Sequence, residues 1–111
     1  MMSETRLVDE ATVRAVCDYL HQSFGEKRVV PFVEQGIQGF RIEDIYGTLL
    51  HVLAVSSDFF DAHPSREIPS VLLRYQVAAA LRQAGRTPVE VTTSGIRAAS
   101  AKAGGAERIA G

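Results

Sequence analysis

The sequence predicts a two-layer α+β domain with the element order α-β-β-β-α-β, in which helices lie on one face of a mainly antiparallel sheet. Apolar residues recur at helical spacing before residue 25 and again after residue 67. The stretch between them, residues 28–57, is rich in β-branched and aromatic residues and is interrupted by glycines. That combination is typical of short strands joined by tight turns.

The first helix is predicted in the segment VDEATVRAVCDYLHQSFG, residues 8–25. Asp9 suits the N-cap, Val8 and Val13 have the spacing of a hydrophobic staple, and Gly25 suits the position after the last turn. Its apolar stripe consists of Val13, Val16, Cys17, Leu20 and Phe24. Because Cys17 belongs to this stripe, we interpret it as a small buried residue and not as a nucleophile.

Three antiparallel strands are expected in residues 28–57, separated by turns at Gly36, Gly39 and Gly47. Pro31 cannot donate a hydrogen bond to a neighbouring strand, so the first strand is placed at an edge or a bulge. The run TLLHVLAV is apolar on both faces, which favours the central position in the sheet. His51 within this run is interpreted as a structural histidine with one satisfied hydrogen bond.

A second helix is predicted over residues 68–84, with Pro69 in its first turn and Gly85 as its terminator. On a helical wheel it has two apolar arcs, and a helix that covers a sheet needs only one. The second arc therefore needs another partner, either the first helix or a second copy of the chain. We expect a homodimer whose interface is formed by Leu73, Val77, Ala80, Leu81 and Ala84.

The segment TPVEVTTSG alternates apolar and polar residues and predicts a half-exposed final strand. Residues 96–111 are rich in alanine and glycine and contain little that could be buried. We therefore expect one domain in residues 1–95, followed by a flexible tail in residues 96–111.

The bulk properties narrow the function. A formal charge of −1 gives no general basic surface for nucleic acid, so a nucleic-acid partner is not expected. The single cysteine excludes an intrachain disulfide and a multi-cysteine zinc site. The N-terminus has no apolar signal region, and the longest apolar run is too short to span a bilayer, so we expect no membrane association and a cytoplasmic location.

The segment SSDFFDAHPSRE, residues 56–67, is the best candidate for chemistry. Asp58, Asp61 and His63 have the ligand types of a divalent-metal or general-base site, with Glu67 close by in the sequence. Their spacing matches neither a calcium loop nor a zinc helix. The alternative is a turn in which Ser57 or Asp58 caps a short helix and Phe59 and Phe60 anchor it.

Arg74, Arg82 and Arg86 follow one i, i+4 ridge of the second predicted helix. This ridge is the candidate surface for an acidic protein partner, with solvated arginines as the alternative interpretation. The sequence contains no GxSxG nucleophile elbow, glycine-rich phosphate loop or dinucleotide motif, so no cofactor is expected.

The order of elements resembles two known architectures. It is similar to the core of the PD-(D/E)XK nucleases, but the third strand, GTLLHVLAVSS, lacks the acidic residue and lysine two positions apart that the resemblance requires. It also resembles type III secretion chaperones, which begin with a helix and three strands. That resemblance implies dimerisation through the second long helix.

The sequence therefore favours a small non-enzymatic binding or adaptor module, chaperone-like or engaged in protein–protein interaction, that forms a homodimer and has a protein partner. The alternative is a metal-dependent hydrolase or nuclease that uses Asp58, Asp61 and His63.

Overall fold

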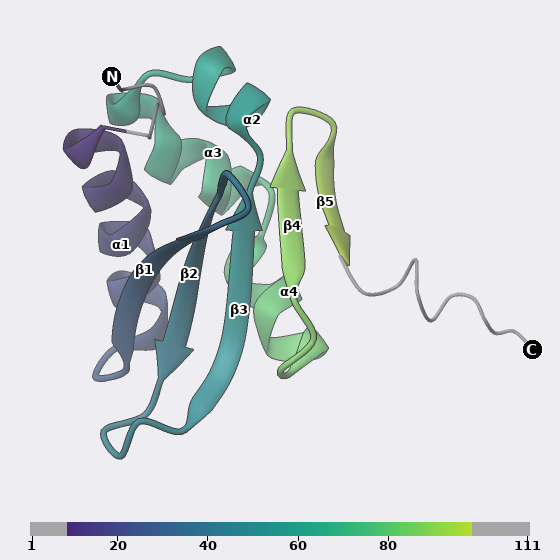
Figure 1. The fold of residues 1–111 in the computed structure, drawn as a ribbon. Helices are drawn as coiled ribbons and strands as arrows, with labels where there is room; N and C mark the ends of the chain where they lie inside the picture. Colours follow the sequence, from purple (N-terminus) through teal and green to yellow (C-terminus); the bar gives the residue numbers. More distant parts are fainter. Residues whose placement is uncertain (1–8, 99–111) are drawn as a thin grey trace, which may run out of the picture.

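The structure, a computed structural model, describes residues 9–98. Its elements are α1 (Glu10–Phe24), β1 (Arg28–Glu34), β2 (Ile37–Glu43), β3 (Leu49–Val55), α2 (Ser57–Ala62), η2 (Ser65–Glu67, a 3₁₀ turn), α3 (Ile68–Arg74), α4 (Val77–Ala84), β4 (Val89–Thr92) and β5 (Gly95–Ala98). The strands form one sheet in the order β1-β2-β3-β4-β5, and the long helices lie on one side of it (Figure 1). The predicted α+β class is confirmed.

The first helix begins and ends where the sequence predicts. The Thr12 amide donates to the side chain of Asp9 at 2.9 Å and so caps α1. The side chain of Thr12, and to a smaller extent its amide, lower the pKa of the Asp9 carboxyl group. Gly25 ends the helix at a φ of 64°, a value that favours glycine, and its amide donates to the His21 carbonyl. Val8, the other half of the predicted staple, lies outside the described residues.

The sheet is mainly antiparallel, with β3 at its centre and β1 at an edge, as predicted. Only β3 and β4 run parallel, because the helical segment between them returns the chain to the end of the sheet at which β3 begins. Gly36 and Gly47 lie in turns, but Gly39 lies within β2, contrary to the prediction. A Cβ atom on Gly39 would collide with the Phe32 ring, so glycine is required there for close packing.

The structure has a fifth strand that was not predicted from the sequence. Residues 95–98 form β5, which pairs with β4 in antiparallel register. Residues 96–98 therefore belong to the sheet and not to the predicted tail. Residues 99–111 lie outside the described part of the chain.

The predicted continuous helix over residues 68–84 is wrong, because it breaks at Tyr75 and Gln76. Gln76 has a left-handed backbone with φ 59° and ψ 45°, and α4 begins immediately after it. This conformation costs a residue other than glycine about 1 kcal/mol or more. The break turns α4 so that it buries Val77, Ala78 and Leu81 in the same core that receives Ile68, Val71 and Leu72 from α3.

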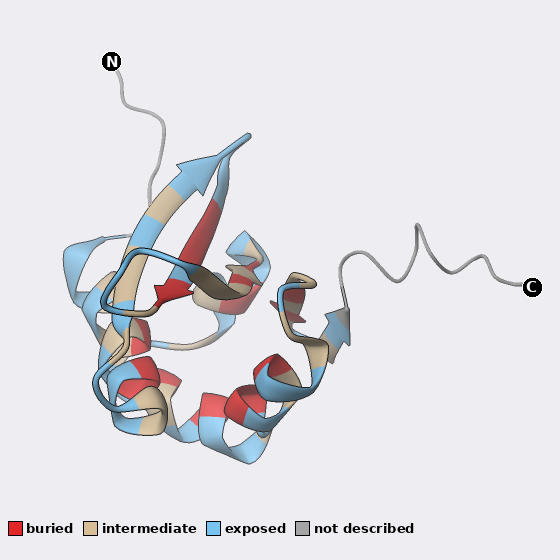
Figure 2. Cartoon of the chain, turned by 90° about the horizontal axis from the view of Figure 1, so that it is seen from below, coloured by how far each residue is buried: buried red, intermediate tan, exposed pale blue. Residues whose placement is uncertain are grey.

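The core lies between the helices and one face of the sheet. Figure 2 shows the buried positions of the helices on the sides that face the strands. The largest side chains with almost no solvent exposure include Phe40, Phe59, Leu20, Ile42, Leu53, Ile68, Leu72 and Leu81. None of the helices in residues 9–98 has the length and apolar character needed to cross a bilayer.

One long-range hydrogen bond joins the broken helix to α1. The Ala78 amide, in the first turn of α4, donates to the hydroxyl oxygen of Tyr19 at 3.0 Å, and both residues are buried. An amide in the first turn of a helix has no acceptor within that helix. Tyr19 therefore caps α4 from a position 59 residues earlier in the chain.

The helix break can be tested with glycine. Since glycine adopts positive φ without a Cβ penalty, Gln76→Gly is expected to leave the free energy of unfolding unchanged or raise it by up to about 1 kcal/mol. Ala79→Gly, at an exposed position within α4, is expected to lower it by about 1 kcal/mol. Chemical denaturation of the two variants measures both values. An equal loss in both would mean that the helix is continuous.

The Tyr19 cap gives a second test. Tyr19→Phe keeps the buried ring but leaves the Ala78 amide without an acceptor, so the free energy of unfolding should fall by about 1–3 kcal/mol. The control is Tyr46→Phe, because Tyr46 is 85% exposed and its loss of a hydroxyl should change stability by less than about 0.5 kcal/mol. Urea denaturation compares the variants, and equal stability of both would contradict the proposed role of Tyr19.

Candidate functional site

Asp58 lies at the start of α2 and takes part in a local hydrogen-bond network. Ser56, and not the predicted Ser57 or Asp58, is the N-cap of this helix and accepts from the Phe59 amide. The Ser56 hydroxyl donates to one oxygen of Asp58, and the Thr93 hydroxyl donates to the other at 3.2 Å. The bond from Ser56, with a smaller contribution from Thr93, lowers the pKa of Asp58. The carboxylate thus links α2 to the turn between β4 and β5.

His63 and Asp61 do not join Asp58. The His63 ring packs against the buried Phe59 ring at 4.7 Å, and its Nδ1 lies 4.0 Å from a carboxylate oxygen of Glu67. Asp61 is exposed on α2. Within residues 9–98, no three histidine, cysteine, aspartate or glutamate side chains are grouped so that they could hold a metal ion. The three predicted site residues are therefore not brought together, and the metal-dependent alternative gains no support.

A cleft of about 350 Å³ lies beside Asp58, where β3 and β4 end. Its polar groups already satisfy one another. Arg97 donates to Glu90 at 3.3 Å, and the Thr92 hydroxyl donates to the Gly95 carbonyl at 3.2 Å. A hydrolytic site needs a nucleophile or a bound water next to a free base. In this cleft the hydroxyl and carboxylate groups hold the turn together instead.

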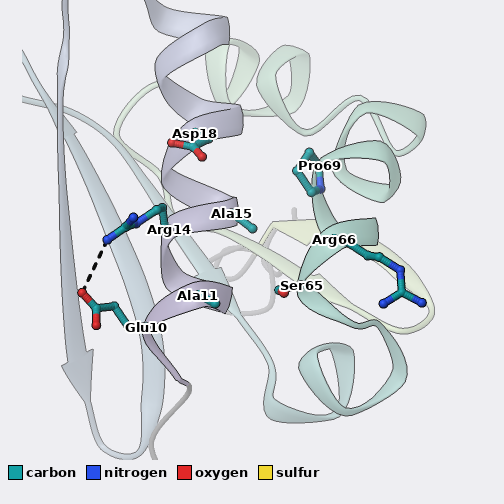
Figure 3. Close-up of a pocket in the computed structure, with 8 residues that line it drawn as sticks. All are labelled: Glu10, Ala11, Arg14, Ala15, Asp18, Ser65, Arg66 and Pro69. Atoms are coloured by element: carbon teal, nitrogen blue, oxygen red, sulfur yellow. Dashed lines mark ion pairs between the residues drawn. The ribbon is translucent and has the colours of Figure 1, made fainter.

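A second cleft of about 450 Å³ runs between α1 and the segment η2–α3 (Figure 3). Glu10 and Arg14 form an exposed ion pair at 3.6 Å along one side of α1, and Arg66 points away from the cleft on the other side. Between them lie small side chains from both elements, namely Ala11, Ala15, Ser65 and Pro69. Asp18 also lines the cleft, and within residues 9–98 no hydrogen bond joins its carboxylate to the Ser65 hydroxyl.

The three predicted partner-binding arginines do not form one ridge. Arg74 ends α3, and the break at Gln76 separates it from Arg82 on α4. The Arg82 guanidinium lies 4.7 Å from the centre of the Phe24 ring and donates to the Ser23 carbonyl. Arg82 therefore joins α4 to the C-terminal turn of α1. Arg74 and Arg86 are exposed, and within residues 9–98 neither takes part in an ion pair.

The five predicted interface residues also occupy different places. Val77 and Leu81 have no exposed surface, and Ala80 and Ala84 pack against the same core. Leu73 is 68% exposed, on the other side of the break. These residues therefore do not form one interface in this conformation, because the chain buries most of the predicted arc itself.

His51 and Cys17 have structural surroundings. The His51 Nδ1 is 2.9 Å from the Gly85 carbonyl, so this nitrogen is the donor, and the ring contacts Phe24 at 5.2 Å. Cys17 is half-buried, and burial, with a smaller effect of Asp18, raises the pKa of its thiol. A raised pKa disfavours the reactive thiolate. Both interpretations from the sequence agree with these surroundings.

Two neighbouring large apolar side chains are exposed in the turn between β2 and β3, which the sequence analysis did not single out. Ile45 is 64% exposed and Tyr46 is 85% exposed. The turn is well fixed: the Asp44 carboxylate accepts from the amides of Tyr46 and Thr48, each at 2.9 Å. An aspartate that starts a turn, followed by two large apolar residues and a glycine, is the signal that could have identified it.

The sheet face opposite the helices carries a second apolar surface. Strand register and alternation place Val30, Phe32, Val52 and Ala54 on this face, while their neighbours Leu53 and Val55 point into the core. The four side chains are half-buried. In residues 9–98, the long helices lie on the other side of the sheet, so they leave this face uncovered.

Comparisons of this chain with protein-family models, with curated proteins and with solved structures find no match. The function must therefore be argued from the geometry of the molecule alone.

Because Asp58, Asp61 and His63 do not lie together, we predict that divalent metal ions will not stabilise the protein. Addition of magnesium, manganese or zinc should leave the melting temperature at its value in chelator, because a ligand stabilises only the state that binds it. Thermal melts of the wild type and Asp61→Ala test this. A metal-induced rise that Asp61→Ala removes would instead restore the hydrolase alternative.

Proposed function

We propose that this protein is a small non-enzymatic adaptor or chaperone-like module that binds another protein and acts as a homodimer in the cytoplasm. The observation that carries the proposal is the fixed turn that exposes Ile45 and Tyr46. Two adjacent large apolar side chains, exposed on a turn whose backbone is fixed by hydrogen bonds, offer another protein an apolar contact surface. The polar candidates, by contrast, serve caps, turns and ion pairs.

The turn suits protein binding for two reasons. Tyrosine supplies a large ring and a polar hydroxyl, and it is enriched among the residues that dominate binding energy at protein interfaces. The two hydrogen bonds to Asp44 hold the backbone in place before binding, which reduces the entropy lost when a complex forms. The partner expected from this chemistry is a protein with an apolar pocket that receives the Tyr46 ring.

The homodimer remains part of the proposal, but residues other than those predicted from the sequence must form its interface. Val77 and Leu81 are completely buried, so a dimer cannot use the arc that the sequence assigned to it without unfolding part of the core.

Photo-crosslinking tests the binding function. A photoreactive phenylalanine analogue replaces Tyr46 in the full chain, and the matched control carries it at Leu73, which is also exposed but lies on α3. We expect a protein attached at position 46 and not at position 73. Once that protein is purified, Tyr46→Ala should weaken its binding at least tenfold, or about 1.4 kcal/mol.

Two results would contradict the proposal. Identical products from both crosslinking positions would show that attachment reflects exposure alone. An unchanged dissociation constant for Tyr46→Ala would show that the turn does not contact the partner.

A further inference from the structure

The central strand has the sequence of a strand that is covered on both faces. Its residues LLHVLAV alternate between Leu53 and Val55, which are completely buried against the helices, and Val52 and Ala54, which lie on the open face. Strands with apolar residues on both sides are typical of sheets covered from both sides. In the part of the chain that the structure describes, the long helices cover only one side (Figure 1).

On the β1–β2 side of the open face, two side chains lie close to the sheet. Phe32 lies directly over Gly39 in the neighbouring strand, where no Cβ projects. The Arg41 guanidinium is 5.6 Å from the centre of the Phe32 ring. Phe32 and Arg41 therefore lie against the sheet, and the apolar residues beside them form a shallow surface. Two sheets pack face to face about 10 Å apart when their side chains interdigitate in this way.

On each side of β3, this face carries one arginine and one glutamate, which form an ion pair within the chain. On β2, Arg41 lies 3.4 Å from the carboxylate of Glu43. Across β3, Glu90 of β4 lies 3.3 Å from Arg97 of β5. A two-fold axis along β3 would place β2 of one copy over β4 of the other. Arg41 of each copy would then lie within two residues, along the strands, of Glu90 of the partner subunit. A long arginine side chain can span that offset, so the surface is complementary to itself.

We propose that two copies of this chain associate through their open sheet faces, with the apolar residues of β3 at the centre, those of β1 toward the edge, and Arg41 close to Glu90 of the partner subunit. This inference rests on the homodimer part of the proposed function and names its surface. It replaces the helix residues expected from the sequence, and it leaves the turn with Ile45 and Tyr46 available for a different protein.

The size of the face predicts the strength of the dimer. Strand spacing of about 4.8 Å and a rise of about 3.3 Å per residue give roughly 450 Å² of sheet per copy, or about 900 Å² in total. Specific interfaces of this small size are typically weak and dissociable. We therefore expect a monomer–dimer equilibrium that shifts over micromolar concentrations, and not a permanent dimer.

Sedimentation velocity of the full chain over a range of concentrations tests the proposal. The wild type should shift from monomer to dimer as its concentration rises. Val52→Lys places a charge at the centre of the face and should raise the dissociation constant at least tenfold. The matched control Leu73→Lys changes an exposed leucine on the helix side and should leave the dimer unchanged. Circular dichroism checks that both variants remain folded.

Charge reversal supplies a second test, with circular dichroism again checking the fold because both residues also form ion pairs within the chain. Arg41 is exposed and Glu90 is half-buried. Arg41→Glu should weaken the dimer, and addition of Glu90→Arg to the same chain should restore part of the lost affinity, because the two residues would lie close to each other across the interface.

Several results would overturn the inference. The first is a wild type that stays monomeric at every concentration, and the second is a dimer that Val52→Lys does not weaken. The third is a dimer that Leu73→Lys disrupts, which would show that the interface is formed by the helices. Tyr46→Ala is expected to leave sedimentation unchanged, so failure of the dimer and failure of partner binding at the turn can be told apart.

Discussion

The structure depends on one constraint: the apolar residues of α3 and those of α4 must reach a single core. A straight helix would direct them to different sides. The chain satisfies both by breaking at Gln76, so that α3 packs against α1 and α4 packs against β3 and β4. Burial of three side chains from α4 outweighs the cost of about 1 kcal/mol for one left-handed residue, since each fully buried aliphatic side chain contributes about 1.5–3 kcal/mol. The Tyr19 hydroxyl then completes the hydrogen bonding of the new helix end.

The same packing decides which surfaces remain for recognition. Because the helices lie on one side of the sheet, the apolar residues of the opposite face keep partial solvent exposure. Arg82, which the sequence assigned to a partner, instead contacts Phe24 and Ser23 within the chain. Two surfaces with partly or largely exposed apolar side chains remain in the described residues: the open sheet face and the turn with Ile45 and Tyr46.

The polar residues, by contrast, are used to maintain the fold. Asp9, Asp44 and Ser56 cap helices or hold turns, and Asp58 joins α2 to the β4–β5 turn through Thr93. A carboxylate that already accepts several hydrogen bonds is stabilised in its charged form and is a poor proton acceptor in catalysis. This is the physical reason why Asp58, in a segment with the composition of an active site, serves as structural support.

The sequence by itself determined the features that depend on residues a few positions apart. These include the limits of α1, the three strands of residues 28–57, the central place of β3 and the end of the second helical segment at Gly85. The N-cap of α2 predicted from the sequence lies one or two residues after the actual N-cap, Ser56. The sequence did not indicate β5, because this short strand is stabilised by pairing with β4. Tertiary structure alone decided the break at Gln76, the role of Tyr19, the contact of Arg82 and the separation of Asp58 from His63. Each depends on contacts between distant parts of the chain, as between Tyr19 and Ala78, and their free energy cannot be read from local spacing.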